Sequence, residues 1–199
     1  IESGFPNRKQ EDWKFLDISQ IIKKNISNLS FFNDYSIPNQ IDQSIFVDGL
    51  EHNKIIFING RIEKIDFSYE DQSKIEIKDE IEKNISFNYE NSLIDLNSAF
   101  THKVFKIFIK KNYSLKKPLI IYHSTDKKIK STNINLRLDF ELGENSCLRL
   151  IDFFTENTAK NFINIFYNFN LEKDSILKNY KIDKFKNDNL KYSFNNIEQ

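Results

Sequence analysis

The stretch that decides the fold is Ile134-Asn135-Leu136-Arg137-Leu138-Asp139-Phe140-Glu141-Leu142, followed by Gly143-Glu144-Asn145. Apolar and polar residues alternate before the glycine, which is the two-residue period of a β-strand with one dry and one wet face. A second strand is predicted from Leu148 to Phe154, where the adjacent apolar pairs Leu150-Ile151 and Phe153-Phe154 indicate cover on both faces for part of its length.

This assignment of faces predicts unequal effects of two neighbouring substitutions. Leu138→Ala removes an inward side chain and is expected to cost about 2–5 kcal/mol of stability. Arg137→Ala, on the wet face, is expected to change the stability by no more than about 0.5 kcal/mol.

The same pattern extends through the second half of the chain, with turns about every 8–12 residues. Residues 101–199 therefore read as one array of strands, and periodicity alone allows a sandwich, a jelly roll or a β-helix. The predicted strands are Val104–Lys110, Leu119–Ser124, Ile134–Leu142, Leu148–Phe154, Phe162–Leu171, Ile176–Ile182 and Leu190–Phe194.

Residues 1–100 contain both helical and strand patterns and are predicted to form a small α/β domain. Asp17 to Lys24 fits a helix with Asp17 as its N-cap, and Ser92 to Phe100 is apolar at a helical period. Ser44–Asp48 and Lys54–Arg61 read as a hairpin, and the charged run Lys78–Lys83 reads as helical.

Composition limits the classes of function. The chain has 199 residues, enough for one or two domains, and its 29 basic and 29 acidic residues leave no net field that would favour nucleic acid or an acidic membrane. Cys147 is the single cysteine, which excludes an intrachain disulfide and fits a reducing, cytoplasmic compartment. No apolar run approaches the ~20 residues needed to span a bilayer. Methionine is absent, even at position 1, so we expect a fragment or a processed product.

The N-terminal segment carries a family resemblance. Gly4-Phe5-Pro6-Asn7-Arg8-Lys9-Gln10-Glu11-Asp12-Trp13-Lys14-Phe15 resembles the signature of the SufD branch of the SufB/SufD family, although Leu16 stands where that family commonly has Thr. Without the resemblance, the segment reads as a short amphipathic turn with Trp13 and Phe15 packed on the domain. Three further blocks are similar to the family: 55–61, 96–123 (in part) and 142–146.

The resemblance implies a right-handed parallel β-helix, truncated here, with the C-terminal helical domain absent. It implies a non-catalytic scaffold subunit of the SUF iron–sulfur cluster assembly complex (SufBCD), which pairs with its paralogue SufB and with the ATPase SufC and helps to supply iron. The family's functional histidine falls beyond Gln199, so no catalytic, cofactor-binding or metal-binding residue is assigned. We also expect the last coil to expose a strand edge and an open hydrophobic end, and hence the chain to associate.

Residues that could carry chemistry are scattered. His52, His102 and His123 lack a shared metal-ligand spacing and read as solvated or capping side chains, and Cys147 reads as a small buried hydrophobe. Solvated faces are also predicted for the acidic pairs Glu70-Asp71 and Asp79-Glu80 and for the lysine pairs at 110–111, 116–117 and 127–128. No glycine-rich phosphate loop is present.

Two other functions stay open at this point. One is a β-helix carbohydrate-active enzyme, for which outward Arg137, Asp139 and Glu141 are the candidate residues. The other is a protein-interaction module unrelated to iron–sulfur chemistry.

Overall fold

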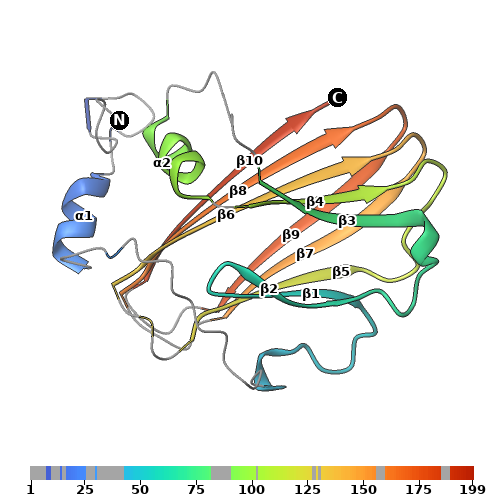
Figure 1. Ribbon diagram of the computed structural model, residues 1–199, viewed down its shortest axis with the longest axis horizontal. Coiled ribbons are helices and arrows are strands. Elements are labelled where there is room, and N and C mark those ends of the chain that lie inside the picture. The colour runs from blue at the N-terminus through green and yellow to red at the C-terminus, as the bar shows by residue number, and fades with distance from the viewer. Residues whose placement is uncertain are drawn as a thin grey trace.

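The computed structural model describes residues 8–9, 14, 17–25, 30, 43–81, 91–101, 103–126, 129, 131–155, 160–184 and 189–199. The fold is mainly β (Figure 1). Its strands are β1 (Asn53–Ile58), β2 (Arg61–Asp66), β3 (Ile75–Glu80), β4 (Val104–Ile109), β5 (Leu119–Ser124), β6 (Asn133–Leu142), β7 (Cys147–Thr155), β8 (Phe162–Leu171), β9 (Ile176–Lys184) and β10 (Leu190–Glu198). Its helices are α1 (Ile18–Asn25), α2 (Ser92–Phe100) and the short 3₁₀ turns η2 (Gln43–Ile45) and η3 (Gln72–Lys74).

The strands form two mixed five-stranded sheets. The first sheet has the order β2-β1-β5-β7-β9 and the second has the order β10-β8-β6-β4-β3. From β4 onward, consecutive strands lie in alternate sheets. Each strand pairs in parallel with the next strand of its own sheet, so that β4 pairs with β6, β5 with β7, β6 with β8, β7 with β9 and β8 with β10. Among the described strands, the antiparallel pairs are β1 with β2 and β3 with β4. The chain therefore passes back and forth between the sheets while each sheet grows by one strand per pass (Figure 1).

This topology repeats at a nearly constant distance along the chain. Asn133 on β6 is in register with Phe162 on β8, and Cys147 on β7 with Ile176 on β9, so both partners are 29 positions away. The offset is 28 between β8 and β10 and 33 between β4 and β6. Residues stacked in one sheet are thus far apart in the sequence, and each layer rests on the layer before it.

The turns between the sheets stack in the same way as the strands. Asn112, Asn145 and Asp174 occupy the same place in successive turns and have positive φ angles of 58°, 55° and 56°. Asn and Asp adopt this left-handed conformation more readily than other non-glycine residues. The Asn112 N–H donates to the Glu144 carbonyl at 2.7 Å, and the Asn145 N–H to the Lys173 carbonyl at 3.0 Å. The hydrogen-bond ladder therefore continues from strand to strand around the turn.

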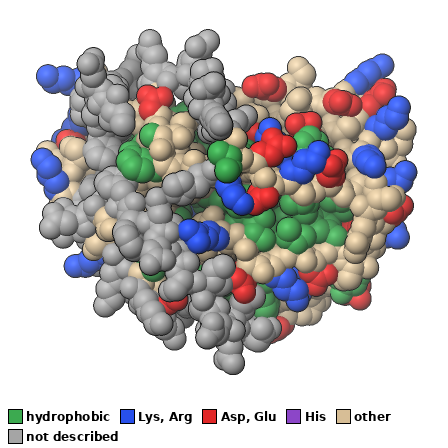
Figure 2. Space-filling view, viewed as in Figure 1, with side chains coloured by type: hydrophobic (Ala, Val, Ile, Leu, Met, Phe, Trp, Pro, Cys, Tyr) green, Lys and Arg blue, Asp and Glu red, His purple; other side chains and the backbone are tan. Residues whose placement is uncertain are grey.

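The core lies between the two sheets and is strongly apolar over most of its length. Leu136, Leu138 and Phe140 of β6 belong to it, as the alternation predicts. Figure 2 shows hydrophobic side chains gathered in a hollow on this face of the molecule. Ile62 of β2 and Ile75 and Ile77 of β3 are partly buried and packed against the core. Charged side chains of both signs are interspersed over the same face of the molecule.

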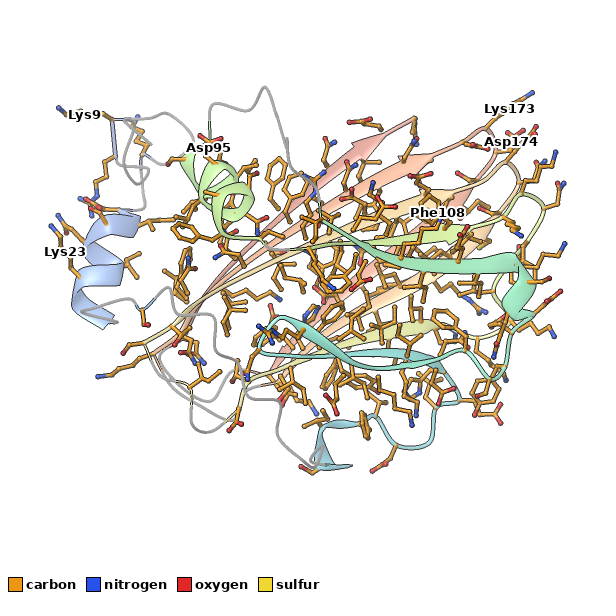
Figure 3. All side chains as sticks on the ribbon, in the orientation of Figure 1. Lys9, Lys23, Asp95, Phe108, Lys173 and Asp174 are labelled. Atoms are coloured by element: carbon orange, nitrogen blue, oxygen red, sulfur yellow. The ribbon has the colours of Figure 1, made fainter. Side chains whose placement is uncertain are left out.

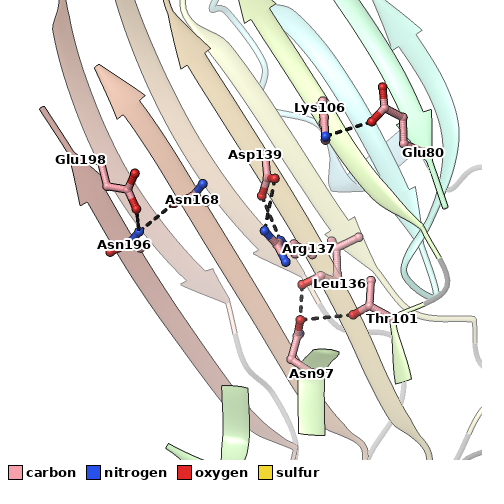
Figure 4. Close-up of polar contacts among 10 residues, drawn as sticks. All are labelled: Glu80, Asn97, Thr101, Lys106, Leu136, Arg137, Asp139, Asn168, Asn196 and Glu198. Carbon is pink, nitrogen blue, oxygen red and sulfur yellow. Dashed lines mark hydrogen bonds and ion pairs between the residues drawn. The ribbon is translucent and has the colours of Figure 1, made fainter. Parts of the chain in front are cut away.

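The outer face of β6 is not wet, so the sequence-based assignment of that face is wrong. Arg137 is 4 % exposed and Asp139 is 8 % exposed, and Arg137 Nε donates to Asp139 Oδ1 at 3.0 Å (Figure 4). The Arg137 guanidinium also lies over the Phe166 ring, 5.3 Å from its centre. Helix α2 covers part of this face, where Asn97 Nδ2 donates to the carbonyls of Leu136 and Asn164.

The predicted elements of the first half are only partly confirmed. Asp17 caps α1, because its Oδ1 accepts from the Gln20 N–H at 3.1 Å, and the helix at Ser92–Phe100 is present. The predicted helix at Lys78–Lys83 is wrong, since Lys78 lies in β3. The predicted strand at Ser44–Asp48 is wrong too, because that segment begins with η2 and the hairpin joins β1 to β2.

Most of the N-terminal signature, apart from Arg8, Lys9 and Lys14, lies outside the described residues. All seven strands predicted after residue 101 are present. The boundary expected at residue 100 stays a prediction, although β1 and β3 pair with strands on its other side. None of the described helices is both long and apolar enough to cross a membrane.

Gly143 lies where two successive turns come close together. A Cβ at this position would lie 2.6 Å from the backbone N of Lys111 and 3.0 Å from the carbonyl of Ile109, so the two turns would have to move apart. We expect Gly143→Ala to lower the free energy of unfolding by about 1–3 kcal/mol, measured by urea titration. Glu144→Ala, in the same exposed turn, is the control and should change it by no more than about 0.5 kcal/mol. Equal small effects would mean that the turns are not in contact.

The buried ion pair on β6 reverses the expectation for Arg137. Arg137→Ala leaves Asp139 charged and unpaired in a mostly dry site, so we expect a loss of about 3 kcal/mol in the same titration. The combined variant Arg137→Met with Asp139→Leu removes both charges and should lose less stability than Arg137→Ala alone. A larger loss in the combined variant would show that the pair itself stabilises the fold.

Candidate functional site

The polar side chains that β9 and β10 place between the sheets form the candidate site. In register with Leu150, Asp152 and Phe154 of β7, strand β9 carries Asn179, Lys181 and Asp183. In register with the apolar inner row of β8, strand β10 carries Lys191, Ser193 and Asn195. Leu177 of β9 and Ile197 of β10 are apolar members of the same rows, in register with Leu148 and Phe169, so the interior changes from apolar to largely polar within one layer. The hydrophobic end expected at the last layer is therefore present only in part, since Ile197 is 56 % exposed.

Six residues in and beside these rows form what we call the charged cluster: His123, Asp152, Tyr167, Lys181, Asp183 and Lys191. They come from strands β5, β7, β8, β9 and β10, so five strands and both sheets contribute. Lys181, Asp183 and Lys191 lie close together in the sequence, but the other three come from three separate strands, which is why the sequence does not reveal the cluster.

The centre of the cluster is enclosed. His123 is 3 % exposed and Asp152 is fully buried. His123 Nε2 lies 2.7 Å from Asp152 Oδ1 and 3.1 Å from the Tyr167 hydroxyl. The imidazole is stacked between the rings of Phe57 and Phe154, with centroids 5.5 Å and 5.8 Å away. The layer structure therefore fixes both the plane and the position of this histidine.

Two lysines lie between this centre and solvent. Lys191 Nζ lies 2.5 Å from Asp183 Oδ1 and 3.9 Å from Asp152 Oδ2, and its side chain is only 6 % exposed. Lys181 Nζ donates to Ser193 Oγ at 2.5 Å and to Asn195 Oδ1 at 3.0 Å. Both ammonium groups also lie over aromatic rings, of Phe154 and Tyr167 respectively. Cations and aromatic faces attract one another, most strongly where water is excluded.

Burial and charge act in opposite directions on the acids of the cluster. Burial raises the pKa of Asp152, but the adjacent His123 and the Lys191 ammonium outweigh it and hold the pKa of this carboxyl at about 2. Burial and the Asp152 charge raise the pKa of Tyr167 well above its ordinary value. Asp152 is therefore an anion, and Tyr167 a neutral hydroxyl, throughout the physiological pH range.

A histidine beside a carboxylate is a common catalytic arrangement, but the surroundings of His123 do not admit a substrate. The cavity beside it has a volume of about 10 Å³ and is lined mainly by apolar residues, including Ile134, Ile163 and Phe154. This is about the room that one water molecule needs. Within the described ranges, no three His, Cys, Asp or Glu side chains gather in a way that would hold a metal ion.

The other predicted chemical residues are spread over the fold. His52 is not solvated but buried, with Nδ1 2.6 Å from the Leu50 carbonyl and Nε2 2.8 Å from the Tyr122 hydroxyl. His123 is likewise not solvated. His102 lies outside the described residues. Cys147 is a free thiol at the start of β7 and is half-buried rather than fully buried.

Glu70 is a buried structural acceptor, so the solvated face predicted for it is wrong. Its carboxylate accepts from Asn53 Nδ2, from the Tyr113 hydroxyl and from the N–H groups of Lys116 and Lys117, at 2.7–3.1 Å. Burial raises its pKa, but these hydrogen bonds outweigh it and the net pKa is lowered. The side chain ties the β2–η3 loop to the β4–β5 turn.

The remaining acidic candidates lie on the surface. Asp79 and Glu80 on β3 form ion pairs with Lys103 and Lys106, as expected for an exposed face. Glu141 is exposed, and partial burial together with neighbouring acidic groups raises its pKa. Figure 4 shows the Lys106–Glu80 and Arg137–Asp139 ion pairs on neighbouring strands of the second sheet.

Comparisons with known proteins do not assign a family. No protein-family model matches the chain, and no curated protein matches it. The family resemblance of the N-terminal signature therefore stays a prediction.

Asp152 makes the stability of the fold depend on pH. Because its pKa is lower in the folded state than the ordinary value near 3.9, its ionisation stabilises the fold above about pH 5, and this contribution is lost as the pH falls from about 4 to about 2. We expect Asp152→Asn to lower the unfolding free energy by roughly 2 kcal/mol at pH 7 and to differ little from the parent near pH 2, measured by urea titration across that range. Asp174→Asn, in an exposed turn, should follow the parent at every pH. If the unfolding free energies of Asp152→Asn and the parent differed by the same amount at every pH, the ionic role of Asp152 would be contradicted.

Proposed function

We propose that the chain is a SufD-like, non-catalytic scaffold subunit of the SUF iron–sulfur cluster assembly complex, and that its two sheets are the faces of a right-handed parallel β-helix. The observation that carries the proposal is the path of the chain. Successive strands alternate between the sheets and pair in parallel at offsets of 28–33 residues, and the turns stack with them. Repeats of this length in which each unit contacts its neighbours are typical of solenoid architectures.

The segments that resemble the SufB/SufD family support the proposal. Block 55–61 contains most of β1 and the Asn59-Gly60 turn, in which both residues have positive φ angles. The next block runs from the end of α2 through β4 to the end of β5. These two blocks therefore contain strands of the stack, and the third block, 142–146, is the turn between β6 and β7. The N-terminal signature supports the family independently of the fold.

The interior supports a scaffold role over an enzymatic one. The histidine and carboxylate at its centre are enclosed, and the cavity beside them has the size of a water molecule. In a scaffold, function lies in the surfaces that partners contact, and a rigid stack of strands holds such surfaces in fixed positions. The partners under this proposal are the paralogue SufB and the ATPase SufC, in the cytoplasm. The iron–sulfur cluster is the cargo of the complex rather than a resident cofactor of this chain.

The residues considered for a carbohydrate-active enzyme give that alternative little support. Arg137 and Asp139 neutralise each other in a buried pair, and Glu141 lies apart from them on the exposed part of β6. A catalytic groove needs a carboxylate that can reach its substrate. The other alternative, a protein-interaction module outside the SUF system, is distinguished from the SUF scaffold by the experiment below.

The proposal is tested by co-expression of the tagged chain with untagged SufB and SufC. We expect SufB and SufC to be retained on the affinity matrix and to co-elute with the chain in gel filtration. Leu138→Asp, which places a charge in the core, is the control and should retain neither partner. The chain remaining folded by circular dichroism while SufB passes through the matrix would overturn the proposal.

A further inference from the structure

Strand β3 is an edge strand of the second sheet, and within the described part of the chain it pairs on one side only, with β4 (Figure 1). That pairing keeps one register along the whole strand, from Ile75 to Glu80. The corresponding edge strand of the first sheet, β2, has a register shift opposite Ile56 and Phe57 of β1. Bulges of this kind twist a strand edge and make it a poor partner for a further strand. Of these two edges, β3 is therefore the regular one.

Alternate backbone groups of β3 point away from β4. The Lys110 N–H donates to the Lys74 carbonyl at 2.9 Å, so in the register of the two strands every second residue from Lys74 onward exchanges hydrogen bonds with β4. The residues between them, Ile75, Ile77 and Asp79, direct their N–H and C=O groups toward the open edge. A further strand could therefore bond to β3 at these three residues.

The side chains on the two faces of β3 differ. Ile75 and Ile77 are partly buried and packed against the core between the sheets. Glu76 and Lys78 lie on the outer face, in register with β4 residues that include Phe108 (Figure 3). The Lys78 ammonium lies 5.2 Å from the centre of the Phe108 ring. A strand added at this edge would thus meet apolar side chains on one face and charged side chains on the other.

Charged side chains commonly protect a strand edge from pairing, but the order of the charges on β3 permits one partner. Asp79 and Glu80 already form ion pairs with lysines of the segment that contains β4. Glu76 and Lys78 pair with each other along the strand, with Lys78 Nζ 2.8 Å from Glu76 Oε1, and both are about half exposed. The two charges have opposite signs and stand on either side of Ile77. The strand is therefore complementary to itself when it is turned around Ile77.

We propose that β3 pairs in an antiparallel arrangement with β3 of a second copy of this chain, with a two-fold axis at Ile77. Ile77 then lies opposite Ile77 of the second copy, and Ile75 lies opposite Asp79, so the outward N–H and C=O groups of all three residues find partners. Glu76 lies opposite Lys78 of the second copy, at a position where the strands come closest and side chains interact most strongly. The axis repeats this Glu–Lys contact on its other side.

The charges also select this register over its neighbours. An axis at Lys78 would place Lys78 opposite itself and Glu76 opposite Glu80. An axis at Glu76 would place Glu76 opposite itself, and an axis at Asp79 would do the same for Asp79. Like charges directly opposite one another destabilise a strand pair. The pairing does not rest on the proposed scaffold function, since β3 and β10 lie at opposite edges of the second sheet.

Reversed charges test the pairing in the full chain by sedimentation equilibrium at low ionic strength. We expect the parent to dimerise reversibly, and Glu76→Lys and Lys78→Glu each to weaken the dimer about tenfold or more, because both symmetry-related contacts become like-charged. An equimolar mixture of the two variants should restore dimerisation, since every contact between unlike copies is again Glu with Lys. Lys178→Glu, at an exposed position of β9, makes the same change of net charge and should dimerise as the parent does. Circular dichroism checks that each variant folds.

Three outcomes of this experiment would overturn the inference. They are a parent that stays monomeric, a mixture that stays monomeric, and an association that persists unchanged in both single variants. The last outcome would place the contact at another surface, such as the β9 or β10 edge. Retention of SufB by the tagged chain is measured separately, so failure of the scaffold proposal and failure of the β3 pairing are distinguishable.

Hydrogen exchange followed by NMR tests the backbone geometry without any substitution. We expect exchange of the Ile75, Ile77 and Asp79 amides to slow about tenfold or more between dilute and concentrated protein, because these N–H groups become bonded in the dimer. The Glu76 and Lys78 amides already bond to β4 and should change little. A dimer in which this alternation is missing would contradict pairing through β3.

Discussion

The fold depends on the requirement that each layer match the layer before it. Parallel strands hydrogen-bond along their whole length only when the register is kept, and here the register passes through the turns as well as the strands. The matching extends to side chains. Phe140 of β6 stacks on Phe169 of β8, and Phe166 of β8 stacks on Phe194 of β10, with ring centroids 5.1 Å and 5.6 Å apart. The turns contribute residues that accept positive φ angles at the same place in each layer.

The charged cluster shows how such a stack can contain ionic groups. Desolvation of a single carboxylate would be very costly, and Asp152 is tolerated because His123 and Lys191 supply nearby positive charge. His123 lies on β5, next to β7 in the first sheet, and Lys191 lies on β10 of the second sheet. The cluster therefore links different layers and both sheets with ionic interactions, in addition to the backbone ladder.

The sequence predicted the strands of the second half well because their apolar residues recur with a period of two. It failed at β3, where Ile75 and Ile77 alternate within a charged run and only pairing with β4 makes the segment a strand. The repeat was missed because the offset drifts from 33 to 28 and few residues are identical between layers. A signal was nevertheless present, since an apolar residue precedes Asn112, Asn145 and Asp174 by three positions in each turn.

The candidate site was beyond sequence reasoning for a related reason. Its members meet only because β5, β7, β8, β9 and β10 are stacked, and each of them looks like an ordinary surface residue in its own segment. The burial of Arg137 was not predicted for the same reason, because the helix that covers part of its face is about 40 positions earlier in the chain. Burial that arises from distant segments leaves no local pattern.

The near-constant offset between layers has a consequence for how such a chain can change during evolution. One complete passage through both sheets, 28 to 33 residues long, begins and ends at equivalent points, so its duplication or excision would bring the flanking strands together still in phase. Length can therefore vary in whole modules, whereas an insertion of a few residues is accommodated only where the chain crosses from one sheet to the other.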